Sequence, residues 1–392
     1  MSSSDASSAS ERDLRLDFFR GIALFSIFID HVDWNSPLAQ FTLRSVGFFD
    51  AADVFILISG YTAGMAYGRA IERQGLLRAG MRIYHRVWQL YVAHVFLFMQ
   101  FMATVAYVVD DLNNSIYAEE FRAADFLKEP GLAVMKALTL QFQPEFMDIL
   151  PLYIVLLAVL PLVLAGFRLW SAGVLAASLG LWCVVQLDKS IALAAYPGSN
   201  QVWFFNPFAW QALFFLGAWC GWRGIQAEIP WLTNRWLFRL AVAGALTAFL
   251  IRFSWTLHWL YNPFPALFGK TLWPLLSKTN LSPLRFANML VLALLVARLL
   301  PPHAQFLAGR AAQPFVICGR HSLHVFCLGI LLATIARLVI NEFFGGALLQ
   351  CVVSAVGIAI MIGTAALMDW FNAGQSPSGP RVLRATATDR GA

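Results

Sequence analysis

The chain has 392 residues, of which 59% are hydrophobic and 13% charged, and its mean hydropathy is +0.64. Soluble domains carry about 25% charged residues, so this composition excludes an ordinary water-soluble fold and predicts a surface largely covered by lipid. The net charge of +6 comes from basic residues scattered between apolar segments, which argues for membrane topology and against nucleic-acid binding.

The chain begins with a polar stretch, residues 1–15, that has no apolar core of the kind a signal peptide needs. We expect a disordered cytosolic tail there, a transmembrane domain over residues 16–371, and a second disordered cytosolic tail over residues 372–392. The five cysteines lie in apolar runs without CxxC spacing, so neither a disulfide framework nor a metal site is predicted.

The first apolar segment, residues 17–34, contains Arg20, Asp30 and His31. Charged groups within a membrane segment are costly and usually face a cavity or a partner. Arg20 and His31 fall within about 20° of one helix face and lie about 16 Å apart along the axis. One face of this helix therefore carries a cation, Arg20, near its cytosolic end and a titratable base, His31, deep in the membrane.

His31 is a candidate general base, because a neutral imidazole accepts protons near pH 7 when a partner orients its second nitrogen. Asp30 points about 100° away from His31 on the same helix. Asp50 and Asp53, which share a face at the start of the second segment, are therefore the better partners, and the sequence leaves open which of them faces the ring.

A basic stripe opens the third segment, with Arg78, Arg82 and Arg86 spaced four residues apart. Ordinary positive-inside anchoring explains any one of these arginines. Together with Arg20 they also form a candidate phosphate-binding mouth, since guanidinium groups bind phosphoryl oxygens bidentately.

About ten segments are long and apolar enough to cross a bilayer as helices of ~20 residues. The sequence thus predicts an all-α integral membrane protein, and the distribution of Lys and Arg predicts that both termini are cytosolic. The segments are residues 17–34, 50–68, 84–109, 148–166, 170–187, 204–222, 236–256, 284–300, 315–340 and 346–370.

The segment 257–283 then faces the outside, and it and its flanks are rich in aromatic residues and proline. Trp255, Trp259, Tyr261 and Trp273 fit an interfacial aromatic belt, or alternatively offer flat apolar faces to sugar rings.

Several motifs resemble those of the transmembrane acyltransferase family three. Arg20 and His31 resemble its signature of an arginine, ten intervening residues and a histidine. ADVFILISGY (52–61), RIY (82–84) and GRHSLHVFCLG (319–329) are similar to three later motifs, in the same order. The chain departs from the family where Arg78 and Arg82 are spaced four rather than three apart, and where Gly329 replaces a histidine.

Within that family the chain most resembles the OpgC branch, in segments such as GFFDAADVFILISGY, DILPLYIVLL and KTNLSPLR. The resemblance implies a multi-pass protein of the bacterial inner membrane that moves a succinyl group from cytosolic succinyl-CoA to a periplasmic glucan. Succinyl-CoA would be the donor substrate, no tightly bound cofactor is expected, and the oligomeric state is open.

On that reading Arg20, Arg82 and Arg86, with Arg78 beside them, hold the donor's phosphates, and His31 acts as base or carries the acyl group itself. The succinyl carboxylate would need a cation, for which the candidates are Lys270, Lys278, Arg285 and Arg252. A proton-coupled transporter or flippase is the alternative, because buried His and Asp residues also suit a proton relay.

Overall fold

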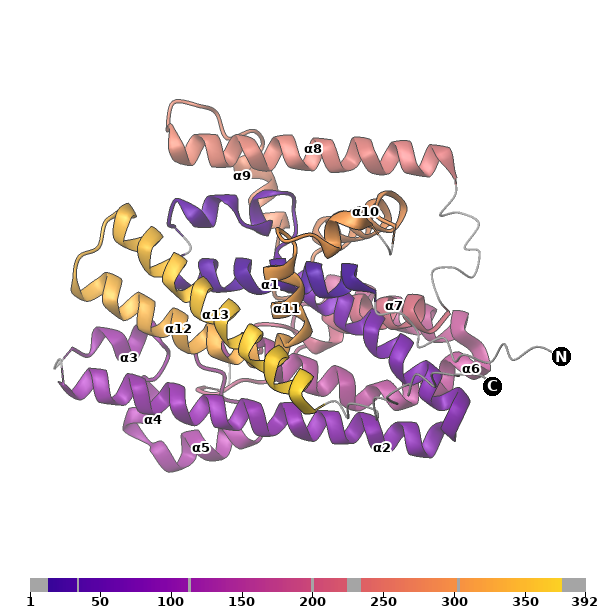
Figure 1. Ribbon diagram of the computed structural model, residues 1–392, viewed down its shortest axis with the longest axis horizontal. Helices are drawn as coiled ribbons and strands as arrows, with labels where there is room; N and C mark the ends of the chain where they lie inside the picture. The colour runs from indigo at the N-terminus through magenta and orange to yellow at the C-terminus, as the bar shows by residue number, and fades with distance from the viewer. Residues whose placement is uncertain are drawn as a thin grey trace, which may run out of the picture.

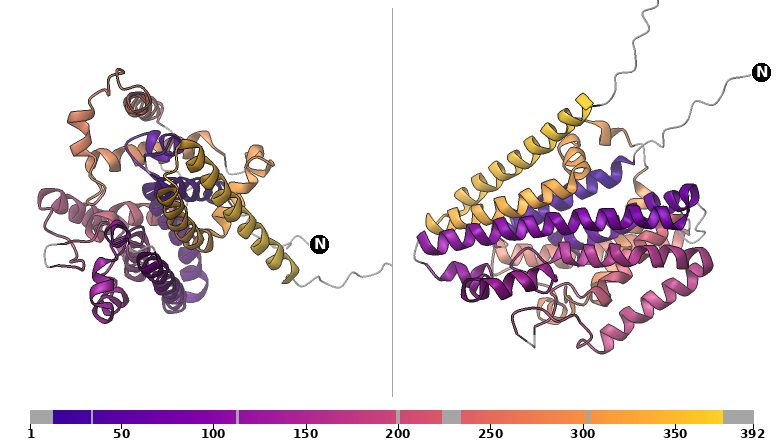
Figure 2. Two further views of the ribbon diagram at one scale, coloured as in Figure 1. Left: turned by 90° about the vertical axis from the view of Figure 1, so that its left-hand side faces the viewer. Right: turned by 90° about the horizontal axis from the view of Figure 1, so that it is seen from below.

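The structure is a computed structural model that describes residues 13–33, 35–111, 114–198, 201–223, 234–301 and 304–375. These residues form helices and short 3-10 turns, with isolated β-bridges and no strand among them. Figure 1 shows the helices running broadly along the long axis of the molecule, and Figure 2 shows the resulting bundle end-on. The α-helices are α1 (Leu14–Val32), α2 (Ala51–Asp111), α3 (Ile116–Glu120), α4 (Ala124–Lys128), α5 (Pro130–Leu138), α6 (Ile149–Leu187), α7 (Pro207–Arg223), α8 (Arg235–Leu260), α9 (Gly269–Leu272), α10 (Pro283–Leu299), α11 (Gln313–Arg320), α12 (Ser322–Glu342) and α13 (Ala347–Gln375).

Two of the helices reverse direction within their length (Figures 1 and 2). In α2 the backbone leaves the helical region at Gly75, whose φ of 81° is accessible to glycine without steric cost. In α6 the break lies at Trp170, with φ −157° and ψ 83°. Each therefore consists of two arms, 51–74 and 76–111 in α2, and 149–169 and 171–187 in α6.

The positions of the ten predicted segments agree with helices or helix arms, with one correction: the segment predicted over 315–340 is broken at His321, between α11 and α12. Within the described residues, five helices are long and apolar enough to cross a membrane, namely α2, α6, α8, α12 and α13. The described residues therefore form an all-α structure with several helices suited to a membrane, while the count of about ten passes and the orientation stay predictions.

The two predicted tails fall mostly outside the described residues, which begin at 13 and end at 375. Helix α1 begins at Leu14 and α13 ends at Gln375, so residues 14–15 and 372–375 are helical where the sequence suggested tail.

Helix α1 lies at the centre of the bundle and packs on α2, α11, α12 and α13 (Figure 1). Close approach to α11 depends on glycine, because a Cβ at Gly21 would collide with the backbone carbonyl of Phe315 and one at Gly319 with that of Asp17. The packing fixes α1, and with it Arg20 and His31, against four other helices.

The first arm of α2 also packs on α7 through glycines that lie against backbone carbonyl groups. Gly60 and Gly64 face the backbone carbonyls of Phe214 and Ala218, and Gly221 faces that of Tyr61. Glycines spaced four apart let two membrane helices come close enough for extensive van der Waals contact.

We expect Gly64→Ala to lower the free energy of unfolding by about 1–3 kcal/mol, because its methyl group would overlap a backbone carbonyl that no side-chain rotation can move. Thermal unfolding in detergent would report this as a lower midpoint. Gly244→Ala, on the exposed face of α8 with open space around it, is the matched control. A midpoint for Gly64→Ala equal to that of the control would contradict the prediction.

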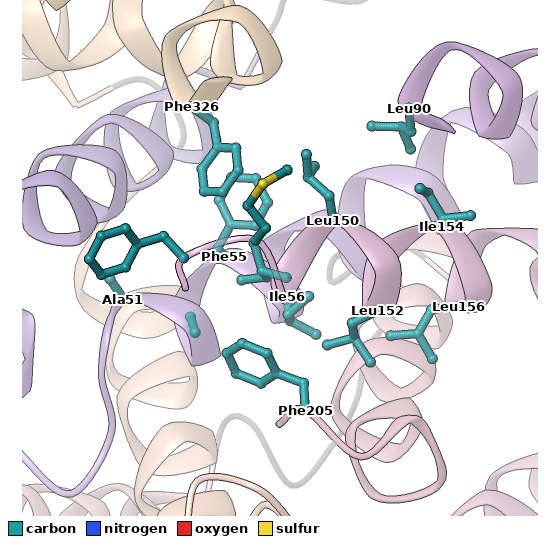
Figure 3. Close-up of a cluster of buried hydrophobic side chains, with 14 of the residues drawn as sticks. Ala51, Phe55, Ile56, Leu90, Leu150, Leu152, Ile154, Leu156, Phe205 and Phe326 are labelled. Carbon is teal, nitrogen blue, oxygen red and sulfur yellow. The ribbon is translucent and has the colours of Figure 1, made fainter. Parts of the chain in front are cut away.

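Between α2, α6 and α12 lies an apolar cluster that includes Phe55, Ile56, Leu150, Leu152 and Phe326 (Figure 3). The rings of Phe55 and Phe326 lie 6.3 Å apart, centroid to centroid. Part of this cluster forms the wall of the cavity described next.

Candidate functional site

A cavity of about 250 Å³ lies where α1, both arms of α2, α6, α11 and α12 meet. Three arginines line it, Arg20 from α1, Arg86 from the second arm of α2 and Arg320 from the end of α11. The other polar lining residues all carry hydroxyl groups: Ser59, Thr62, Tyr67, Tyr153 and Ser322. A small space with three guanidinium groups and several hydroxyl donors is suited to a polyanion such as a phosphate-bearing ligand.

Neighbouring side chains hold these arginines in place. Arg20 donates to the hydroxyl of Thr62, and Arg86 donates to Oε1 of Gln89 over 3.0 Å. Arg320 pairs with Asp369 of α13 at 2.7 Å, and Oδ1 of the same carboxylate lies 2.7 Å from Nε2 of His321.

Of the arginines predicted to bind phosphate, Arg20 and Arg86 therefore share one cavity. Arg78 and Arg82 lie on the same arm of α2, but they are exposed and are not among the lining residues. Arg320 was missed by the sequence analysis; the signal for it is a basic residue in GRHSLHVFCLG, directly before an apolar helix.

Apolar side chains close the rest of this cavity. Phe55, Leu90, Leu150 and Phe326 are lining residues, and Figure 3 shows them within the buried cluster. An anionic head group would thus meet arginines, while an aliphatic arm of the same ligand would meet hydrocarbon.

His31 lies at the other end of α1, one residue before its last. Its ring stacks on Phe146, with centroids 4.3 Å apart and planes inclined by 23°. Nδ1 of His31 is buried and has no hydrogen-bond partner among the described residues. Lys278, Arg337 and Asp50 lie close enough for their charges to act on the ring.

Asp50 and Asp53 belong to a charged cluster next to this end of α1. Asp53 is fully buried and binds Arg285 of α10, whose Nε lies 3.0 Å from Oδ1. Asp50 pairs with Arg285 at 2.7 Å and with Nζ of Lys278 at 2.9 Å. The cluster joins the start of α2 to the segment 276–285.

The hydrogen bonds that these two carboxylates accept thus come from Arg285, from Lys278 and from the backbone amides of residues 50 and 52. Asp30 accepts a hydrogen bond from Thr42 at 2.9 Å and lies 3.5 Å from Nε of Arg44. The direct contact between His31 and Asp50 or Asp53, expected from the sequence, stays a prediction.

The four cations proposed for a succinyl carboxylate lie in different surroundings. Lys270 is exposed, Arg252 donates to the carbonyl of Arg44 over 2.6 Å, and Arg285 is bound by two aspartates. Lys278 pairs with Asp50 and keeps about a third of its side chain exposed. A further cation, Arg337, lies 5.4 Å from the centroid of the Phe146 ring that stacks on His31.

His94 is the second buried histidine, with no exposed surface. Among the described residues neither ring nitrogen of His94 has a hydrogen-bond partner.

The aromatic residues near 257–283 divide into two groups. The indole nitrogens of Trp255 and Trp259 donate to Leu267 and Asn35 within the protein. Tyr261 and Trp273 keep most of their surface exposed, as either an interfacial belt or a sugar-binding surface would require.

Asp148 precedes α6, in the segment that also carries Phe146. Burial raises the pKa of this carboxyl from 3.8 to about 6, with the Glu145 charge adding to the effect and Lys278 and Arg122 opposing it. Because the pKa is raised in the folded state, protonated Asp148 stabilises the fold below pH 3.8, and this contribution is lost as the pH rises through about 6.

We therefore expect Asp148→Asn to flatten the pH dependence of stability between pH 4 and pH 7 and to raise the unfolding midpoint relative to wild type at pH 8. Thermal unfolding across this pH range measures both effects. Asp188→Asn, at the exposed end of α6, is the control, since hydrogen bonds from Ser190 lower the pKa of that carboxyl. Parallel profiles for wild type and Asp148→Asn would contradict the prediction.

One of the comparisons with known proteins, that with protein families, found a match. No curated protein and no solved structure matched the chain. The family described as OpgC protein matches residues 12–373, which span the cavity, His31 and the charged cluster. This family points to a transferase with a role in glucan modification. The chain belongs to the OpgC family.

Proposed function

We propose that this protein is a membrane-embedded acyltransferase that moves a succinyl group from cytosolic succinyl-CoA to a hydroxyl group of a periplasmic glucan. The observation that carries the proposal is the three-arginine cavity at one end of the helix that bears His31. Membership of the OpgC family supports both the transferase class and the glucan acceptor.

In this mechanism Arg20, Arg86 and Arg320 hold the phosphates of the donor. Arg78 and Arg82, exposed on the same arm of α2, raise the positive potential at the mouth. The pantetheine arm passes the apolar wall and extends along α1, and the eleven residues from Arg20 to His31 correspond to about 16 Å of helix.

At the end of this path farthest from the arginine cavity, His31 takes the proton from the attacking glucan hydroxyl. The hydroxyl oxygen then forms a bond to the thioester carbon, the carbon–sulfur bond breaks, and the thiolate of CoA receives the proton. Positioned bases of this kind contribute about 10²–10⁴ to the rate. Asp50 and Asp53 serve by holding Arg285 and Lys278 beside the reacting groups.

The free carboxylate of the succinyl group would be bound by Lys278, which pairs with Asp50, and by Arg337, which contacts the Phe146 ring stacked on His31. Arg337 is itself held by Glu120 at 2.6 Å. A cation at this position favours a donor with a second carboxylate over a neutral acyl group of similar size.

We expect Lys278→Met and Arg337→Met each to lower the ratio of kcat/KM for succinyl-CoA to that for acetyl-CoA by about tenfold, equivalent to about 1.4 kcal/mol. Lys270→Met, at an exposed site on the same side, is the control and should leave the ratio unchanged. An unchanged ratio in both test variants would reject these two residues as the carboxylate site.

Purified protein in liposomes, supplied with labelled succinyl-CoA and a periplasmic-type glucan, tests the proposed function directly. Label on the glucan is expected with wild type, and Arg86→Ala should raise the KM for succinyl-CoA while Arg78→Ala, outside the cavity, changes it much less. Correctly inserted wild type that neither binds CoA nor transfers label would overturn the proposal.

A further inference from the structure

Phe146 lies in the segment between α5 and α6 with its backbone in the left-handed region, at φ 69°. That conformation is strained for a residue with a large side chain and persists where the surrounding structure imposes it. The neighbouring backbone is tied down, because the amide of Glu145 donates to the carbonyl of Phe121 over 3.3 Å and Met147 donates to Pro144 over 3.1 Å. The side chain of Glu145 also pairs with Arg122 at 3.0 Å.

This backbone conformation places the ring of Phe146 in contact with His31. Phe146 is 8% exposed, and its ring stacks on the imidazole at 4.3 Å. The ring of Phe121 meets it edge-on at 6.5 Å. The guanidinium carbon of Arg337 lies 5.4 Å from the Phe146 centroid, within the range of a cation–π contact.

A catalytic histidine usually has its plane fixed by a hydrogen bond to its second nitrogen. Here Nδ1 of His31 has no such partner among the described residues, while the face of the ring is in van der Waals contact with Phe146. Stacking restricts the imidazole's rotation through contact with the face of the ring, and it occupies neither ring nitrogen.

We propose that Phe146 is a positioning residue that holds the His31 imidazole in its reactive orientation by stacking, in place of a hydrogen-bonding carboxylate. The left-handed backbone at residue 146 and the Arg337 contact serve to keep the Phe146 ring on His31. The proposal rests on the proposed function for its kinetic consequence, but the position of His31 can also be measured without any turnover.

The first test compares Phe146→Leu, which keeps the bulk but removes the flat face, with Phe146→Tyr, which keeps the ring. Phe98→Leu is the matched control, because Phe98 is a buried core phenylalanine with edge-on contacts to Phe126 and Phe142. We expect kcat to fall about tenfold to a hundredfold in Phe146→Leu, with the KM for succinyl-CoA unchanged and most of the kcat restored in Phe146→Tyr. Phe98→Leu should lower the unfolding midpoint without this loss of kcat.

The second test does not depend on activity. Acylation of His31 by diethylpyrocarbonate, followed by mass spectrometry of the peptide, should be several-fold faster in Phe146→Leu than in wild type or Phe98→Leu, because the reagent reacts at a ring nitrogen and an imidazole released from the stack can turn its nitrogens toward the reagent. Equal labelling rates in all three proteins would overturn the proposal, as would a kcat in Phe146→Leu within twofold of wild type. A wild type that transfers no succinyl group would contradict the proposed function alone, and the labelling rates would still decide the position of His31.

Discussion

His31→Ala is expected to abolish succinyl transfer, lowering kcat by about 10²–10⁴, while the protein still folds and inserts in the membrane. The physical reason is that the methyl group left behind cannot accept the proton of the glucan hydroxyl. The loss should appear in kcat and leave the affinity for CoA nearly unchanged, because the phosphate-binding arginines lie at the opposite end of α1.

The matched control is His258→Ala on α8, a histidine whose Nδ1 lies 2.6 Å from the carbonyl of Phe264 and which takes no part in the proposed path. Transfer assays in liposomes, with CoA binding measured on the same preparations, separate chemistry from binding. Transfer by His31→Ala at the wild-type rate would exclude His31 as the base.

Among the substitutions considered, Arg285→Met should cause the largest loss of stability, about 3–5 kcal/mol, because it leaves the buried carboxylate of Asp53 without a cation and leaves Asp50 paired with Lys278 alone. Arg285 has an 8% exposed side chain and Asp53 none, so water cannot replace the lost ion pair. Thermal or denaturant unfolding in detergent measures the loss. Arg298→Met, at the exposed end of the same helix, is the control and should cost much less.

A double variant sharpens this test. Asp53→Asn removes one of the two stranded carboxylates, so Arg285→Met combined with Asp53→Asn should be more stable than Arg285→Met alone. Additive effects of the two substitutions would show that the Arg285–Asp53 pair contributes little coupling energy, contrary to the prediction.

Much of this protein could be inferred from local sequence features. Apolar segments gave the positions of the helices, since a membrane segment needs a continuous apolar run whatever its neighbours are. The spacing of Arg20 and His31 placed a cation and a base on one face of one helix, and Asp50 and Asp53 on one face of another, because helical periodicity is a local property.

Local sequence patterns could not predict which other side chains these residues contact in the folded protein. Of the basic stripe, Arg86 lines the cavity and Arg78 and Arg82 do not, which depends on how the second arm of α2 rotates against α6 and α12. Arg320 reaches the same cavity from a segment 300 residues after Arg20 in the chain.

The sequence by itself thus indicated an all-α membrane protein and its family. It also placed Arg20 and His31 on one face of the first helix. The tertiary structure alone decided that Asp53 binds Arg285, that Arg320 completes the cavity, and that Phe146 stacks on His31. The physical reason is that periodicity fixes where a side chain points on its own helix, whereas its partner is fixed by the close packing of helices and by a strained turn at residue 146.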